Sequence, residues 1–305
     1  MTAPSAYCPQ YAAERHTQHL NGLSHEVLHW PRNSRPKLLL LHGWMDCADT
    51  FQALVDTLPP QYDIYAFSWR GFGGSQWQHS AYYERMVMLQ DLHQFLDHIS
   101  PNDAIHVCGH SMGSMLATHF ACLFPERIKS LTMAEGFGMP VLDQADELRA
   151  RARRFVHTPE PNPAYTLKSI TDVAEKLCKR NPQMSLALAH HMAQALTQYT
   201  EQGLVYRADP KHHLPQAHPY DWHRIAPLWT HLHMPTLWLQ GENLPHNHYL
   251  QRVESLLAER QALLPNLQKI VSLKGSGHML QWEAPQAFAD ALDKFLRQVE
   301  AKSVQ

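Results

Sequence analysis

The sequence has almost no net charge, because 26 Lys and Arg residues face 28 Asp and Glu residues among 305, a formal charge of −2. A chain this close to neutral offers no electrostatic attraction to nucleic acid or to an anionic membrane, and we expect neither as a partner. Long apolar runs are also lacking. The run at residues 38–41 suits a buried strand and is far too short to cross a bilayer. The first ten residues contain two prolines and no apolar stretch, so we expect no secretory signal.

Cysteine is scarce, with five residues at unrelated spacings and no Cys-x-x-Cys pair. An odd number without that motif argues against a disulfide framework, and we expect reduced thiols in a cytoplasmic protein. The 23 histidines are numerous but scattered, without the close pairing with cysteine or carboxylate that a zinc site requires. We therefore expect no metal site.

The first part of the chain alternates between strand-length apolar segments and helical patterns. Regular alternation of this kind predicts an α/β protein with a mostly parallel, doubly wound sheet. The expected strands are residues 24–30, 37–41, 62–68, 104–108 and 128–135, and the expected helices are residues 49–58 and 83–99.

After residue 136 the alternation stops and the pattern becomes largely helical, with helices expected at residues 142–156, 167–178 and 184–198. Strands are expected again at residues 236–240 and 268–273, before a terminal helix at residues 285–299. We therefore predict an α/β core formed by residues 23–136 and 235–305, with a helical cap inserted at residues 137–234. Residues 1–22 are expected to form a poorly ordered lead-in.

The most informative segment is Gly-His-Ser-Met-Gly at residues 109–113, which lies between a predicted strand and a predicted helix. In that context Gly-x-Ser-x-Gly is typical of a nucleophile elbow, a sharp turn that exposes the serine Oγ. The two glycines are needed because a side chain at either position would collide with neighbouring backbone. Ser111 is therefore the candidate nucleophile, and it requires a histidine base elsewhere in the chain.

His278 is the candidate base, because it follows the last predicted strand in the segment Lys-Gly-Ser-Gly-His-Met at residues 274–279. Glycines beside a histidine at a strand end allow the loop to fold back toward the elbow. There the imidazole would accept the Ser111 proton and later return it to the leaving group. Nucleophile first and histidine last is the order found in α/β-hydrolases.

Two backbone amides are candidates for an oxyanion hole. His-Gly-Trp at residues 42–44 follows a predicted strand, so the Trp44 amide can turn toward the elbow, where the Met112 amide also lies. Two fixed donors would stabilise the alkoxide that develops after attack on a carbonyl.

The acid that orients the histidine is less clearly marked. The usual position is the loop after residues 236–240, but there Leu244 stands in place of the expected aspartate. Glu135, at the end of the strand after the elbow helix, is preferred because an unpaired carboxylate behind a buried strand would be costly. Glu242 remains the alternative acid.

Four motifs together make the chain resemble an α/β-hydrolase: His42-Gly43-Trp44-Met45-Asp46, Gly71-Phe72-Gly73-Gly74-Ser75, the elbow at residues 109–113, and Gly275-Ser276-Gly277-His278. Within that superfamily it is similar to the serine hydrolase-like proteins, through the His-Gly-Trp-x-Asp segment and the Glu135-Gly136 pair. The resemblance implies the α/β-hydrolase fold, the pairing of Ser111 with His278 and the oxyanion hole. It does not imply a substrate, because this fold hosts many reactions.

We therefore predict a serine hydrolase that cleaves a carboxylic ester of a small or medium-sized substrate through an acyl-enzyme, with neither metal nor organic cofactor. Its partner would be that small-molecule ester, and the protein would be a monomer or a homodimer. Carbon–carbon, thioester or amide hydrolysis by the same residues, or a non-catalytic small-ligand-binding protein, are the alternatives. Four arginines of the first cap helix could attract an anionic substrate or form a solvated face: Arg149, Arg151, Arg153 and Arg154.

Overall fold

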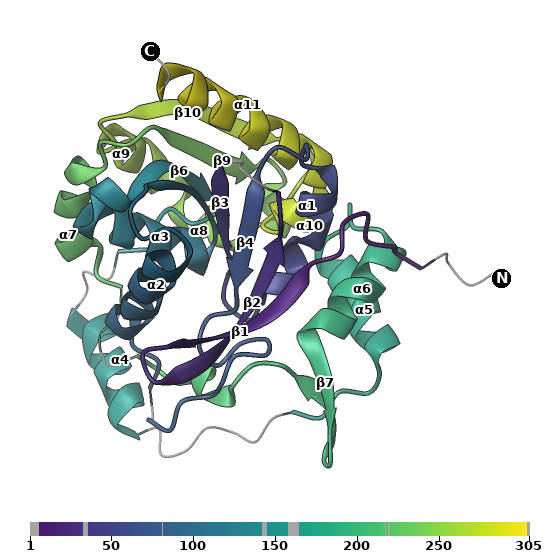
Figure 1. Ribbon diagram of the computed structural model, residues 1–305. Helices are drawn as coiled ribbons and strands as arrows, with labels where there is room; N and C mark the ends of the chain where they lie inside the picture. The colour runs from purple at the N-terminus through teal and green to yellow at the C-terminus, as the bar shows by residue number, and fades with distance from the viewer. Residues whose placement is uncertain are drawn as a thin grey trace.

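The computed structural model describes residues 6–32, 36–80, 82–141, 145–157, 165–216, 218 and 220–303. Within these residues an eight-stranded sheet runs through the molecule in the order β1-β2-β4-β3-β5-β6-β9-β10 (Figure 1). The first three pair antiparallel, and β4, β3, β5, β6, β9 and β10 pair parallel. The strands are β1 (Glu14–Leu20), β2 (Leu23–Trp30), β3 (Lys37–Leu41), β4 (Asp63–Phe67), β5 (Ile105–His110), β6 (Ile128–Ala134), β9 (Thr236–Gly241) and β10 (Leu267–Leu273). The prediction of an α/β fold with a mostly parallel sheet is confirmed.

Helices cover both faces of this sheet, which is why successive leucines of β3 are buried on both sides. On β3, Leu38 and Leu40 pack against α1 and α11, whereas Leu39 and Leu41 pack in the core formed with α2 and α3. The helices that flank the sheet or connect its strands are α1 (Gln52–Thr57), α2 (Arg85–Ile99), α3 (Met112–Leu123), α8 (His248–Val253), α9 (Leu257–Ala262), α10 (Leu280–Glu283) and α11 (Pro285–Ser303).

The expectation of a poorly ordered lead-in at residues 1–22 is wrong for much of that range. Strand β1 pairs with β2 along its whole length, from Glu14 opposite His29 to Leu20 opposite Leu23. Its sequence gives no apolar signal, because most of its side chains are exposed. The order comes from backbone pairing across the hairpin, a contact that hydrophobic periodicity does not report. Residues 1–5 lie outside the described residues.

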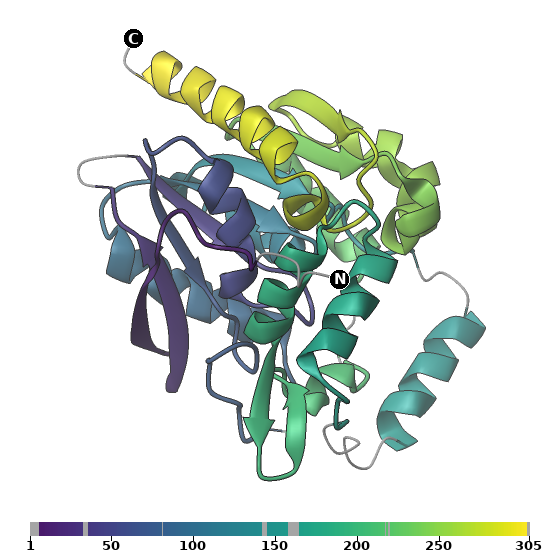
Figure 2. The same cartoon turned by 90° about the vertical axis from the view of Figure 1, so that its right-hand side faces the viewer.

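The segment between β6 and β9 contributes no strand to the eight-stranded sheet within the described residues. Figure 2 shows α5 and α6 packed together and α4 standing apart from them. A β-hairpin follows α6, which the sequence analysis did not anticipate. The elements here are α4 (Ala145–His157), α5 (Ile170–Arg180), α6 (Leu186–Leu196), β7 (Thr197–Thr200), β8 (Gly203–Tyr206) and α7 (Trp222–Ile225). Residues 142–144, within the first expected helix, lie outside the described residues.

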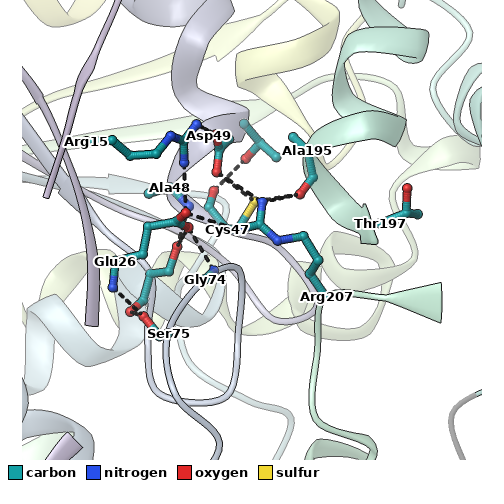
Figure 3. Close-up of polar contacts among 12 residues, drawn as sticks. Arg15, Glu26, Cys47, Ala48, Asp49, Gly74, Ser75, Ala195, Thr197 and Arg207 are labelled. Carbon is teal, nitrogen blue, oxygen red and sulfur yellow. Dashed lines mark hydrogen bonds and ion pairs between the residues drawn. The ribbon is translucent and has the colours of Figure 1, made fainter. Parts of the chain in front are cut away.

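A charged cluster ties this inserted segment to the sheet (Figure 3). The buried Glu26 of β2 accepts hydrogen bonds from Arg15 at 2.8 Å, from Arg207 at 3.0 Å and from the Gly74 amide at 2.8 Å. Arg207 follows β8 and also donates to the Ala195 carbonyl at the end of α6. Burial by itself would raise the pKa of Glu26, but the two arginines and the amide outweigh it and hold that pKa below its usual value.

Among the described residues, none of the helices combines the length and the apolar character required to cross a bilayer.

Candidate active site

Ser111 occupies the sharp turn between β5 and α3, with φ of 52° and ψ of −117°. A non-glycine residue with this backbone is strained, and the strain lifts the side chain clear of the sheet. The neighbouring glycines are required sterically. A Cβ on Gly109 would lie 2.5 Å from the Ser114 backbone, and one on Gly113 would lie 2.2 Å from the Leu41 carbonyl oxygen. The predicted elbow is therefore present as a local structure.

His278 lies in the loop after β10, and its Nε2 is 3.0 Å from the Ser111 Oγ. Its other ring nitrogen, Nδ1, is 3.1 Å from the Glu135 Oε2. These two distances make a continuous hydrogen-bonded chain of hydroxyl, imidazole and carboxylate, in which the imidazole lies 143 and 167 positions along the sequence from its two partners. Such a chain has the geometry needed to remove a proton from the serine.

Glu135 directly follows β6, is fully buried, and has a φ of 50°. The Gly241 amide donates to its Oε1 at 2.6 Å, and the Asn247 side chain donates to its Oε2 at 2.7 Å. These donors hold the carboxylate in one orientation toward His278. Sequence reasoning missed Asn247, because nothing in its local sequence marks it as a partner of a glutamate 112 positions earlier.

Glu242, the alternative acid, is exposed at the end of β9. Its backbone amide bonds to the Leu273 carbonyl, and no hydrogen bond joins its carboxylate to His278. Leu244 begins a short 3-10 turn that leads to Asn247. The structure therefore brings Glu135 to the imidazole and leaves Glu242 in solvent.

The loop after β3 lies against the elbow, since a Cβ on Gly43 would be 3.1 Å from the Ser111 Cβ. His42 accepts a hydrogen bond from the Trp69 amide at 2.9 Å and donates to the Gly43 carbonyl at 2.8 Å. Burial lowers the pKa of His42 to about 4, so the ring is neutral and can accept one hydrogen bond while it donates the other. The Gly43 carbonyl and the Trp44 amide belong to one peptide unit, so His42 fixes the direction of the Trp44 N–H.

The Met112 amide, the second predicted oxyanion donor, begins α3. Amides in the first turn of a helix have no intrahelical partner and point out of its N-terminus. The two predicted donors thus belong to the loop after β3, which contacts Ser111, and to the first turn of α3, which directly follows it.

His110, which precedes the nucleophile, forms a hydrogen bond with the backbone of His278, the candidate base. Its Nε2 is 2.8 Å from the His278 carbonyl oxygen, and the Gln281 side chain bonds its Nδ1 at 3.3 Å. Burial lowers the pKa of His110 to about 3, which keeps this ring neutral. Sequence reasoning treated His110 only as a variable position of the elbow and missed this role.

Residues 36–285 match the family model described as the alpha/beta hydrolase fold. The chain belongs to the α/β hydrolase fold family. It is 25% identical to human serine hydrolase-like protein 2 over 194 residues, 60% of this chain and 60% of that protein. It is 33% identical over 105 residues to the pimeloyl-[acyl-carrier protein] methyl ester esterase of Vibrio vulnificus, 34% of this chain and 38% of that one.

Among solved structures, this α/β hydrolase is similar to the thioesterase domain from the curacin biosynthetic pathway. The TM-score is 0.81, with 94% of this chain and 99% of that chain covered. At 20% identity this likeness concerns the fold alone. The chain spans about 60% of the length of the serine hydrolase-like relatives that it matches.

A cavity of about 1730 Å³ reaches His278 in this α/β hydrolase. Apolar side chains of the inserted segment and of α10 line part of it, among them Leu177, Leu196 and Trp282. The Trp44 side chain also lines it and is 49% exposed. The candidate base is therefore open to a molecule larger than water.

One group of three possible metal ligands occurs among the described residues, formed by Glu14, His16 and His29 with ligand atoms within 4.8 Å. The expectation that no histidines cluster with a carboxylate is wrong here, because antiparallel pairing places Glu14 opposite His29. The group is on the β1–β2 edge of the sheet, whereas Ser111 follows the central strand β5.

Proposed function

We propose that the protein is a serine hydrolase that cleaves a carboxylic ester of a small or medium-sized substrate through an acyl-enzyme. The observation that carries this proposal is the hydrogen-bonded chain from Ser111 through His278 to the buried Glu135. A serine bonded to an imidazole that is itself held by a carboxylate is an activated nucleophile.

In the proposed reaction His278 Nε2 takes the proton of Ser111 as its Oγ bonds to the ester carbonyl carbon. The amides of Trp44 and Met112 bind the negative oxygen of the tetrahedral intermediate. The carbon–oxygen bond to the alcohol then breaks, and the alcohol leaves with the proton from His278. Water, deprotonated by the same imidazole, releases the acid and restores Ser111, while Glu135 stabilises the imidazolium in both halves.

Similarity to an enzyme named as a methyl ester esterase supports ester cleavage as the preferred reaction. Thioesters, amides and certain carbon–carbon bonds react through the same acyl-enzyme chemistry, and these are the alternative substrates. A panel of esters that varies the acyl chain and the alcohol, with matched thioesters and amides, measures which bond the protein cleaves fastest.

The proposal is tested by labelling with a fluorophosphonate, which reacts covalently with activated serines. We expect labelling of the wild-type protein and none of the Ser111→Ala or His278→Ala variants. The exposed Ser80→Ala variant is a matched control and should be labelled like the wild type. Failure to label under conditions that label a known esterase would favour a non-catalytic protein that binds a small ligand.

We also propose a cytoplasmic location. All five cysteines are free, and three of them are buried, as expected for thiols that are kept reduced.

A further inference from the structure

Positive charge is concentrated on the walls of the cavity that reaches His278. Its lining includes Arg154 of α4 and Lys176, Lys179 and Arg180 of α5. Among the described residues that line it, Asp46 is the one carboxyl group. Since the whole chain has a formal charge of −2, this excess of positive charge is local.

Asp46 does little to offset these charges. It is only 3% exposed, and its Oδ1 accepts hydrogen bonds from the Thr50 hydroxyl and the Cys47 amide. Burial raises the pKa of Asp46 to about 7, so the carboxyl is only partly ionised at neutral pH. The field inside the cavity is therefore set by the lysines and arginines.

Lys179 and Arg180 are the cations best placed to bind a ligand. Both are exposed, and no carboxylate in the described part of the chain forms an ion pair with either of them. Lys176, by contrast, is paired with Asp172 at 2.7 Å. Cations in the last turn of a helix also stabilise it by complementing its macrodipole. A test of ligand binding must therefore measure the ligand and not the stability of α5.

These two cations are close to the loop that carries His278. The residue after them, Asn181, lines the same cavity. A short way further along, Gln183 lies against the loop that carries His278, because a Cβ on Gly275 would be 3.9 Å from the Gln183 side-chain nitrogen. The residues just after α5 thus contact the segment that leads to the candidate base.

The cavity is also larger than a short ester requires. At about 1730 Å³ it exceeds the roughly 300–1,000 Å³ of most small-molecule sites. Its apolar side chains include Met279 and Trp282, which follow His278 closely in the chain, and Leu177, which is on α5 like the cations Lys179 and Arg180. A lining of this kind suits a substrate that has both an apolar part and a charged part.

Resting on the proposed ester hydrolysis, we propose that the natural substrate carries an anionic group, a carboxylate or a phosphate, which Lys179 and Arg180 bind. The arginine-rich helix raised a similar idea from the sequence, but of its four arginines the structure places only Arg154 on the cavity. The charge that selects the substrate comes mainly from α5.

The test compares two matched pairs of substrates. 4-Nitrophenyl hydrogen adipate against 4-nitrophenyl hexanoate adds a carboxylate on the acyl side. Hexanoyl-4′-phosphopantetheine against hexanoylpantetheine adds a phosphate on the leaving-group side. We expect kcat/KM to be about tenfold higher for the anionic member of at least one pair, and the preference to shrink at high salt. The pair that shows the preference identifies the source of the anion.

The Lys179→Gln/Arg180→Gln double variant should lose most of that preference. A matched control, Lys294→Gln/Lys302→Gln, removes the same charge from exposed positions of α11 and should keep it. Equal kcat/KM for both members of both pairs in the wild type, or an unchanged preference in the Lys179/Arg180 variant, would overturn the proposal.

A binding measurement separates this inference from the proposed function. Isothermal titration calorimetry with adipate and with 4′-phosphopantetheine uses the Ser111→Ala protein, in which no turnover occurs. We expect one of them to bind, and Lys179→Gln/Arg180→Gln in the same background to weaken that binding about tenfold. Binding of an anion without hydrolysis of any substrate would support the anion site and contradict the proposed esterase activity. Hydrolysis of neutral esters without anion binding would support the esterase activity and contradict the anion site.

Discussion

Ser111 and Glu135 both have a positive φ, of 52° and 50° respectively. Few non-glycine residues adopt it, and it is held only where the surrounding structure compensates for the strain. Here it lifts a hydroxyl above one strand end and a carboxylate above the next, since β5 and β6 are neighbours. Two strained residues on adjacent parallel strands therefore present their side chains to the same imidazole.

The role of Glu135 leads to a prediction at a single residue. Glu135→Gln keeps the shape but removes the charge that stabilises the imidazolium, so we expect kcat for a cleaved ester to fall by roughly 10²–10⁴-fold. Steady-state kinetics on the best ester of the panel measures this loss. The exposed Glu242→Gln variant removes the same charge outside the hydrogen-bonded chain and should change kcat little. A large loss in Glu242→Gln with little in Glu135→Gln would reverse the assignment.

At the scale of elements, the inserted segment is attached to the sheet by charge as well as by apolar packing. Glu26 of β2 lies between Arg15 of β1 and Arg207, which follows β8 (Figure 3). Removing Glu26 deprives Arg207 and the Gly74 amide of a buried acceptor, although Asp49 still faces both arginines, and the loss of such an acceptor is destabilising. The β1–β2 hairpin and the β7–β8 hairpin thus depend on one carboxylate.

We expect Glu26→Gln to lower the free energy of unfolding at pH 7 by about 3 kcal/mol. Because the folded-state pKa of Glu26 is held below its unfolded value of 4.5, its contribution is complete above pH 4.5 and is lost as the pH falls below it. The difference between wild type and variant should therefore shrink in acid. Urea denaturation at pH 7 and below pH 4.5 measures it, with the exposed Glu201→Gln as control. A difference that does not change with pH would contradict the ionic role.

For the molecule as a whole, buried neutral histidines govern the response to acid. Burial lowers the pKa of four of them to about 3 or 4: His42, His110, His119 and His212. In the unfolded chain these rings take up protons near pH 6.5, whereas in the folded protein they do not. Acid therefore favours the unfolded state before most carboxylates titrate.

We expect the free energy of unfolding to be greatest above pH 6.5 and to fall as the pH drops from 6.5 toward 4. Each such histidine contributes a slope of about 1.4 kcal/mol per pH unit over this window. Urea denaturation at pH 7, 6 and 5 measures the sum. Stability that stays constant between pH 6.5 and 5 would show that these rings are protonated in the folded protein.

Local patterns in the sequence were sufficient for the parallel strands and the helices between them, and they marked Ser111 and His278 as candidates, but they missed β1 and the β7–β8 hairpin. A buried parallel strand must be apolar on both faces. A nucleophile elbow must have glycines at positions where an added Cβ would lie only 2.2–2.5 Å from neighbouring backbone atoms. Both requirements act on residues that are adjacent in the chain. They can therefore be recognised without coordinates.

Contacts between distant segments were decided only in three dimensions. The carboxylate that faces His278, the Asn247 amide that holds it and the cations on the cavity wall each join parts of the chain far apart in sequence. A hydrogen bond or an ion pair depends on the distance between two side chains. That distance is set by the packing of the whole sheet and its helices, which neither partner's local sequence encodes.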